Sequence, residues 1–279
     1  MASRAGSFVA LTVLSVTLSF LLPSTPQPIA YHDFADHRQY FGVANFLDVA
    51  SNVGFLLAGL SGLVITFRRR TRFVFEAERW PYALFFAGML FTAAGSAYYH
   101  LSPDNERLFW DRLPMTIAFM SLVAAQVVDR LSVRAGLALV LPLLAMGAAS
   151  VVYWRATERA GVGNLVPYGI LQAYAVVVLL FFAVWHPSRY TRGNDVYGVF
   201  AAYVVAKLFE LADRQVLGVG SIVSGHTLKH LAAAIAGAFV CRMLLLREPA
   251  PLEAQKYDSR RPLLRTSSVA QWKEPPKGA

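Results

Sequence analysis

The sequence predicts an all-α protein that crosses a membrane several times, from its composition and from the length of its apolar stretches. Of its 279 residues, 56% are hydrophobic and only 15% are charged, and the mean hydropathy is +0.45. Average soluble proteins are about 45–50% apolar and about 25% charged. Because one membrane-spanning helix needs roughly 20 apolar residues, the chain has room for seven or eight. The composition therefore argues against a soluble enzyme, a disordered chain and a secreted disulfide scaffold.

Apolar stretches of about this length recur along the chain between short polar segments. They cover residues 7–23, 45–66, 81–99, 112–129, 134–154, 165–185, 196–213 and 223–246. The last seven predict a seven-helix membrane domain over 45–246, preceded by an outer loop over 25–44. The first lies within 1–24 and has a basic start and an apolar middle. It fits an extra N-terminal helix, used as a signal anchor, or a cleaved signal sequence, and a retained helix is the preferred interpretation.

The excess of positive charge indicates how these helices are oriented. Twenty-six Lys and Arg against seventeen Asp and Glu give a net charge of +9. If every stretch spans, the most basic segments fall on one side, and they contain Arg68, Arg69, Arg70, Arg72, Arg130, Arg134, Arg189, Arg192, Arg242 and Arg247. The opposite loops are less basic, apart from 155–164, which holds Arg155 and Arg159. Basic loops are usually cytoplasmic, so the charge reports topology and argues against nucleic-acid binding.

Residues 247–279 predict a disordered cytoplasmic tail. This segment contains five prolines and many charges. It has too few apolar residues to bury a face of any size, and such segments stay disordered.

The stretch 196–213 contains three ionisable residues. Helical spacing places Lys207 near Glu210, and Glu210 near Asp213. Such side chains are costly where they face lipid, so we expect them to face the bundle interior and to pair. They predict either a buried ion pair that fixes the packing or the wall of a polar cavity.

Three polar motifs lie at the ends of predicted helices. Ser96 and His100 stand at the end of one stretch, Asp111 at the start of the next, and His226 and His230 at the start of the last. Residues four apart share one face of a helix, about 6 Å apart along its axis. Under the predicted topology, all three motifs lie in the same leaflet, opposite the basic loops. The sequence therefore predicts that they share one depth in the membrane.

Three histidines at one depth indicate a zinc site. They can supply three nitrogen ligands and leave a fourth position for water, and a His pair at i and i+4 is a known way to present a metal. Asp111 could transfer a proton of that water, act as a fourth ligand, or hold a histidine in the right tautomer. Ser96 could stabilise a developing oxyanion, or it could pack between helices as small residues do in membranes.

These motifs resemble the alkaline ceramidase family. The resemblance is carried by Ser-x-x-x-His at 96–100, by Asp111 before Leu-Pro-Met, by His-x-x-x-His at 226–230, and by the run Phe-Leu-Asp-Val-Ala-Ser-Asn at 46–52. The chain is similar to the bacterial branch of a superfamily that also includes the progestin and adipoQ receptors. The similarity covers about 45–246.

The resemblance implies a seven-helix zinc amidase that cleaves ceramide to sphingosine and a fatty acid. By this resemblance the zinc ligands would be His100, His226 and His230. Asp111 would be the proton-transfer residue and Ser96 the oxyanion stabiliser.

Eukaryotic members of the family also have an acidic calcium site before and at the start of the first core helix. The Trp-Cys-Glu run of that site is missing from this chain, and Asn45 stands where the family has a glutamate at the helix start. The resemblance leaves Asp33, Asp36 and Asn45 as candidate calcium ligands, since calcium takes oxygen ligands.

Three functions are compatible with these features. The leading hypothesis is a zinc-dependent amidohydrolase that acts on ceramide or another N-acyl lipid, in a bacterial inner membrane with its active site towards the periplasmic leaflet. The first alternative is a non-enzymatic seven-helix receptor or stress protein with a structural zinc. The second is a proton- or ion-coupled transporter that uses Lys207, Glu210 and Asp213. An open fourth zinc position next to Asp111 and Ser96 would distinguish the enzyme from the receptor.

Overall fold

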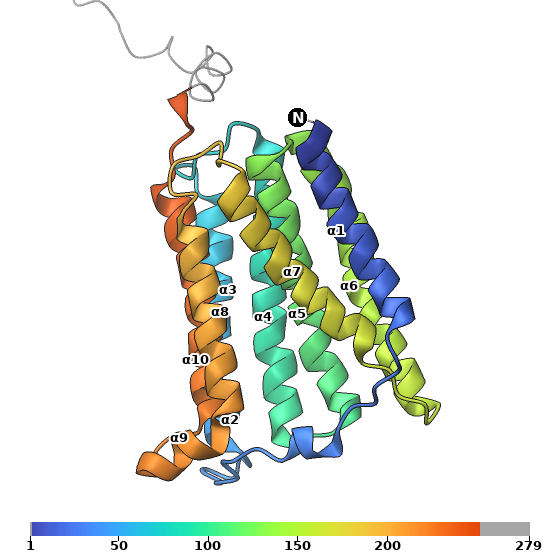
Figure 1. Ribbon diagram of the computed structural model, residues 1–279. Coiled ribbons are helices and arrows are strands. Elements are labelled where there is room, and N and C mark those ends of the chain that lie inside the picture. The colour runs from blue at the N-terminus through green and yellow to red at the C-terminus, as the bar shows by residue number, and fades with distance from the viewer. Residues whose placement is uncertain (1, 252–279) are drawn as a thin grey trace, which may run out of the picture.

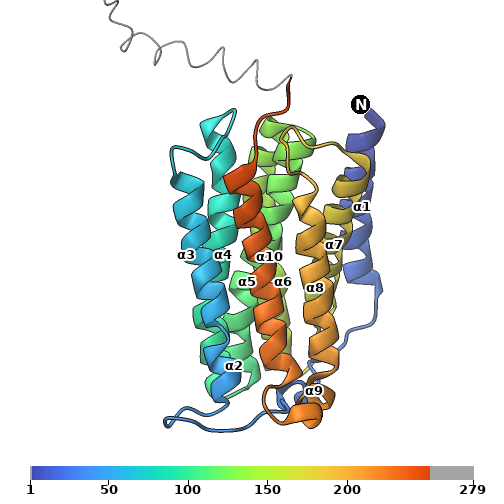
Figure 2. The same ribbon diagram turned by 90° about the vertical axis from the view of Figure 1, so that its left-hand side faces the viewer.

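The structure, a computed structural model, describes residues 2–251 as a bundle of long helices that run side by side (Figures 1 and 2). The described helices are α1 (Ala2–Leu21), α2 (Phe46–Ala50), α3 (Val53–Phe67), α4 (Arg79–Leu101), α5 (Asn105–Arg130), α6 (Val133–Arg159), α7 (Val166–Trp185), α8 (Asp195–Leu211), α9 (Asp213–Gly220) and α10 (Gly225–Leu246), with short 3-10 helices η1 (Ile29–His32) and η2 (Glu76–Glu78). The predicted tail from residue 252 onward lies outside the described residues.

Five helical segments in the described part of the chain are long and apolar enough to cross a membrane. They are Phe46–Phe67, which joins α2 and α3, and the helices α5, α6, α7 and α10. The helix α8 is shorter, at 17 residues. The helix α4 is continuous, but buried polar side chains such as Thr92 and Ser96 make it less apolar. The polar side chains of α4 are buried against other helices, where an interior position tolerates polar groups. The prediction of an all-α membrane protein is confirmed.

Side-chain caps define where three of the long helices begin. The Asp104 carboxylate accepts a backbone N–H of α5 at 2.6 Å, and the Ser132 hydroxyl accepts one of α6 at 3.4 Å. The Ser224 hydroxyl accepts a backbone N–H of α10 at 3.0 Å. These caps satisfy N–H groups that the first turn of a helix leaves unpaired. The cap at Ser224 thus helps to set the register in which α10 presents its histidines.

Two glycines permit close backbone contacts near the polar motifs. A Cβ on Gly95 would collide with the carbonyl oxygen of Trp110, so this glycine lets α4 and α5 approach each other beside Ser96 and Asp111. A Cβ on Gly225 would collide with the backbone of α8. Small residues at helix contacts allow this kind of approach in membrane bundles. The glycines thus allow close approach of α4 to α5 and of α10 to α8 beside the polar motifs.

The first helix, α1, packs on the outside of the bundle against α7 (Figure 1). The hydroxyls of Thr12 and Tyr174 are 2.9 Å apart, and the rings of Phe8 and Phe182 are 5.6 Å apart. These contacts are of the kind that a retained helix makes. Retention of this helix stays a prediction.

The segment between α1 and α2, residues 22–45, crosses one end of the bundle (Figure 2). We call it the strap, and we call this end, where α4 finishes and α10 begins, the histidine end. The backbone N–H of Leu165 donates to the carbonyl oxygen of Thr25 at 2.7 Å. The N–H of Ala35 donates to the Asp213 carboxylate at 2.8 Å. The predicted loop over 25–44 is therefore fastened to the helices it crosses.

At two places, the structure shows ion-pair partners of basic residues that the sequence interpretation did not include. Arg155 and Arg159, the exception to the charge pattern, both pair with Glu106 at the histidine end. One carboxylate offsets one of their two positive charges, which reduces the excess basic charge of this loop. Arg247, predicted to begin a solvated tail, is only 2% exposed and pairs with Asp129. The packed part of the described chain therefore includes Arg247.

Candidate active site

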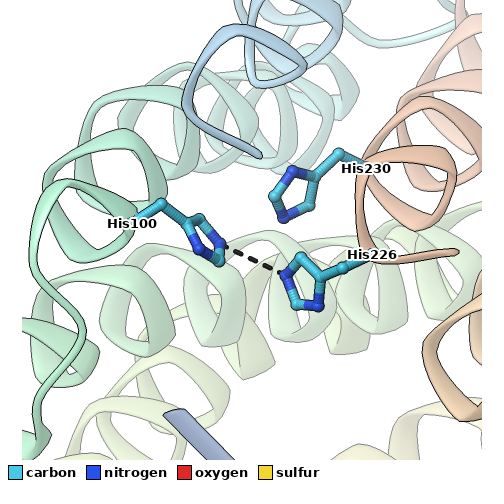
Figure 3. Close-up of side chains that lie close together, drawn as sticks. All are labelled: His100, His226 and His230. Carbon is cyan, nitrogen blue, oxygen red and sulfur yellow. Dashed lines mark hydrogen bonds between the residues drawn. The ribbon is translucent and has the colours of Figure 1, made fainter. Parts of the chain in front are cut away.

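Three histidines meet at the end of the bundle where α4 finishes and α10 begins. His100 comes from the last turn of α4, and His226 and His230 come from the first turns of α10 (Figure 3). We call them the histidine cluster, and each is at most 4% exposed. The Nε2 atoms of His100 and His226 are 3.3 Å apart. One ring nitrogen from each residue lies within 4.8 Å of the others.

Polar neighbours hold the two histidines of α10 in position. The Ser51 hydroxyl is hydrogen-bonded to Nδ1 of His230 at 2.8 Å, which leaves Nε2 of that ring available. The backbone N–H of His226 donates to the Asp213 carboxylate at 2.7 Å. A hydrogen bond to one ring nitrogen determines which nitrogen is free to bind a metal. The arrangement therefore preorients these side chains.

The cluster has the spacing and chemistry of a metal site. Zinc–nitrogen bonds of about 2.0–2.1 Å at a tetrahedral angle place two ligand nitrogens roughly 3.3 Å apart. The Nε2 atoms of His100 and His226 have this separation. Nδ1 of His100 has no hydrogen-bond partner in the described chain, although it is buried. The buried cluster can hold a metal ion, and neutral imidazole donors are compatible with zinc.

A buried carboxylate behind the cluster was missed by the sequence interpretation. Asp48, on α2, is fully buried, and its Oδ1 accepts hydrogen bonds from the hydroxyls of Thr227 (2.6 Å) and Ser224 (3.3 Å). Its Oδ2 has no partner in the described chain. The signal was present, because an aspartate inside an apolar stretch is costly unless it has a specific role. Asp48 links α2 to the start of α10.

Ser96 and Asp111 lie on facing parts of α4 and α5. Both are buried, at 2% and 8% exposed. The Ser96 hydroxyl is within hydrogen-bonding reach of the Asp111 carboxylate. Since Ser96 precedes His100 by about one turn, Asp111 lies on the same side of α4 as the histidine cluster. The structure thus brings these motifs to one end of the bundle.

A cavity of about 340 Å³ opens beside Asp111, between α4, α5, α7, α8 and α10. Most of its lining is apolar, and Phe85, Met89 and Leu122 are among the lining residues. An apolar cavity with a few polar groups at one end is typical of a ligand site. Its shape and chemistry are compatible with the acyl chain of a lipid.

The three ionisable residues predicted on 196–213 have two different positions. Lys207 and Glu210 line the cavity and are hydrogen-bonded at 2.5 Å. Glu210 also accepts a hydrogen bond from Lys229 of α10 at 2.8 Å, a partner that helical spacing within α8 could not reveal. Asp213 does not line the cavity. Its carboxylate accepts backbone N–H groups from α10 and the strap, because it stands where α8 gives way to α9.

The candidate calcium ligands have other partners in the described chain. Asp36 is held through both oxygens by Arg38, and hydrogen bonding from this guanidinium lowers the pKa of the Asp36 carboxyl. Asp33 pairs with Arg214 at 2.6 Å on the surface. The Asn45 amide nitrogen donates to the carbonyl oxygen of His100 at 2.8 Å. A calcium ion would compete with the bound arginines, and the site stays a prediction.

The strap covers the histidine cluster. The ring of Phe34 lies 4.7 Å from that of His100 and 4.3 Å from that of His226, measured between centroids, and Phe34 is buried. His32 is hydrogen-bonded to the Tyr99 hydroxyl at 2.8 Å. The sequence interpretation missed Phe34, since one aromatic residue in a loop carries no recognisable pattern. Its position shields the cluster from solvent.

Fold and site together define a polytopic membrane protein with a buried, metal-compatible histidine cluster beside an apolar cavity. The family model for ceramidase matches residues 35–215. Because the match covers more than half of the chain, the protein belongs to the ceramidase family, and the predicted resemblance is confirmed. Membership indicates a membrane enzyme that hydrolyses the amide bond of ceramide, a lipid substrate. No curated protein matches the chain.

The matched segment contains one part of the candidate site and stops before the other. Ser96, His100 and Asp111 lie within it, whereas the histidines of α10 follow its end. The family match and the histidine cluster are therefore partly independent observations.

Proposed function

We propose that this protein is a zinc-dependent amidohydrolase that cleaves ceramide or a related N-acyl lipid and releases a fatty acid. The observation that carries the proposal is the buried histidine cluster, with Ser96 one helical turn from His100 on α4 and buried Asp111 on the neighbouring helix α5. Zinc held by His100, His226 and His230 would act as a Lewis acid that makes water available as a nucleophile near neutral pH.

Asp111 is proposed to carry the proton in this reaction. Its carboxylate lies beside the cavity in which the amide would sit. It would accept a proton from the attacking water and donate it to the amide nitrogen as the carbon–nitrogen bond breaks. The hydroxyl of water then remains on the acyl carbon, and the products are a fatty acid and an amine.

Ser96 is proposed to stabilise the oxyanion that forms when the amide carbonyl is attacked. Its hydroxyl is buried close to Asp111, and buried donors aimed at a developing charge are far more effective than donors in water. The strap would exclude bulk water through Phe34.

The membrane supplies a reason for the position of the site. The tails of a lipid substrate would occupy the apolar cavity while the amide reaches the histidine end. Arg247 follows the last residue of α10, and we call the end of the bundle where it lies, opposite the histidine end, the Arg247 end. The charge pattern of the loops supports an orientation with the histidine end away from the cytoplasm and the Arg247 end towards it.

The test is hydrolysis of a panel of ceramides and other N-acyl lipids by purified protein, with and without a zinc chelator. We expect fatty-acid release that the chelator abolishes and that added zinc restores. If no lipid in the panel is cleaved by zinc-loaded protein, the enzyme proposal is wrong, and a receptor with structural zinc becomes the better hypothesis. Chelator-resistant hydrolysis would exclude the zinc mechanism alone.

A further inference from the structure

The polar end of the cavity has more positive than negative charge. Five charged side chains line it: Asp111, Arg112, Lys207, Glu210 and Lys229. Three are cations and two are carboxylates. Glu210 accepts a hydrogen bond from Lys207 and another from Lys229, so this group of three has one positive charge in excess.

Arg112 is a buried guanidinium that no carboxylate among the described residues pairs with. It is 3% exposed, and its Nη2 donates to the neutral amide oxygen of Gln27 at 2.6 Å. Its Nη1 has no hydrogen-bond partner in the described chain. Arginine stays charged under all ordinary conditions, and a buried charge is costly unless it is paired. The unpaired donor is therefore available to bind an anionic ligand.

Aromatic rings hold this guanidinium in a fixed position. Its Cζ lies 4.4 Å from the ring centroid of Trp154, 4.8 Å from Tyr168 and 5.4 Å from Tyr31. Such contacts stabilise a cation, and they do so more strongly when it is desolvated. They leave Nη1 without a hydrogen-bond acceptor in the described chain. The side chain is preorganised, with a donor left for a ligand.

We infer that the cavity binds an N-acyl lipid whose head group carries a phosphate or carboxylate, with Arg112 as its main partner and Lys229 as a second cation. This inference rests on the proposed function and names the substrate class of the same site. Arginine pairs well with phosphate and carboxylate because its planar fork matches their oxygens. A neutral diol head group would leave the excess charge uncompensated.

The same chemistry would also fit the carboxylate of the fatty-acid product. The geometry favours the head group, because the apolar lining provides a place for the acyl chain and Arg112 lies at the end where the cavity becomes polar. The two sources predict different kinetics and can be separated.

The test compares two substrates that differ only in charge: a ceramide and the same ceramide esterified with phosphate on its primary hydroxyl. We expect wild-type kcat/KM to be about tenfold or more higher for the phosphorylated lipid, as is typical of a hydrogen bond to a charged group. This comparison needs no variant. A wild-type ratio of one or less would overturn the inference while leaving the hydrolase proposal intact.

Variants locate the preference on Arg112. The ratio of the two kcat/KM values should fall about tenfold in Arg112→Gln and be partly retained in Arg112→Lys. The matched control is Arg107→Gln, which changes an arginine of the same helix that lies over Tyr98 and does not line the cavity. An unchanged ratio in folded Arg112→Gln would contradict the assignment.

Two further measurements separate the remaining outcomes. Inhibition by free fatty acid that Arg112→Gln relieves, together with a wild-type ratio near one, would assign the arginine to the product carboxylate and overturn the head-group assignment. If neither lipid is hydrolysed, the proposed function fails. Thermal stabilisation of wild type by each lipid then decides this inference, with greater stabilisation by the phosphorylated lipid in support and equal stabilisation against it.

Discussion

The two ends of the bundle differ in how completely their buried polar groups are paired. At the Arg247 end, Arg247 pairs with Asp129 at 3.2 Å and lies over the rings of Tyr190 and Phe73. Asp129 also accepts a hydrogen bond from the Tyr82 hydroxyl at 2.6 Å. At this end, therefore, a buried cation is paired with a buried carboxylate, and a hydroxyl from a distant part of the chain donates a hydrogen bond to the same carboxylate.

The histidine end leaves several buried groups without such neutralisation. Nδ1 of His100, Oδ2 of Asp48 and Nη1 of Arg112 have no hydrogen-bond partner in the described chain. At the Arg247 end, Nε of Arg79, Oδ1 of Asp129 and Nη2 of Arg247 also lack a hydrogen-bond partner in the described chain, but each belongs to a group already joined in an ion pair. Buried polar groups are normally satisfied. The comparison indicates that one end stabilises the fold and the other is arranged for ligands.

The largest effect is expected from removing a histidine. Wild-type protein should contain about one zinc per chain, and His226→Ala or His230→Ala should lose the metal and all hydrolysis, since each removes one of only three proposed protein ligands. Elemental analysis and ceramide hydrolysis measure the two losses. Full zinc retention in both variants would exclude the ligand assignment.

Asp111→Ala should separate metal binding from chemistry. We expect zinc to be retained while the rate of amide hydrolysis falls about 10²–10⁴-fold, the usual contribution of a positioned general acid–base residue. Glu106→Gln is the control, because Glu106 is a half-exposed carboxylate on the same helix that pairs with surface arginines. Wild-type rates in the Asp111 variant would show that the proposed mechanism is incorrect.

Asp129→Asn should destabilise the protein without altering its chemistry. Breaking a buried ion pair costs about 3–5 kcal/mol because the partner charge stays buried, and Arg247 would lose its carboxylate. Thermal inactivation in detergent should occur at lower temperature, while hydrolysis per zinc-loaded molecule stays unchanged. A variant with normal stability and impaired hydrolysis would reverse the roles assigned to the two ends.

Ser51→Ala should weaken zinc binding by about 10–100-fold, as is typical when a residue that orients a metal ligand is removed. The loss follows from the hydrogen bond between Ser51 and His230. Chelator titration measures it. Ser150→Ala is a suitable control, since within the described chain this buried hydroxyl donates to the backbone of its own helix, at Gly147. Equal affinities in the two variants would remove Ser51 from the site.

The smallest effect concerns the strap and pH. The folded-state pKa of Asp36 is lowered by hydrogen bonding from Arg38, so the pair contributes stability above about pH 4, the usual pKa. That contribution is lost as the pH falls through the lowered pKa. Hydrogen exchange of the strap should therefore rise in acid, and Asp36→Asn should abolish this pH dependence. Identical pH profiles in wild type and variant would contradict the coupling.

Much of the site was predictable because its residues stand at regular spacings on helices. Ser96 and His100 share a face by helical periodicity, as do His226 and His230, and the charge pattern placed both pairs on one side of the membrane. Lys229 and Phe34 were not predictable in this way. Their contacts join segments far apart in the chain, and neither belongs to a repeating pattern.

By itself, the sequence determined that this is an all-α membrane protein, because the bilayer requires long apolar helices whatever their neighbours are. It also determined the family through short motifs in a set order. Only the tertiary structure decided which polar groups are paired, because pairing depends on how helices pack. Asp213, a candidate for the cavity wall, lies at the start of α9 instead. Arg247, expected in the tail, is in a buried ion pair, and Arg112 lines the cavity. Many polar residues are buried in the described chain, and packing alone assigned them to stability or to the site.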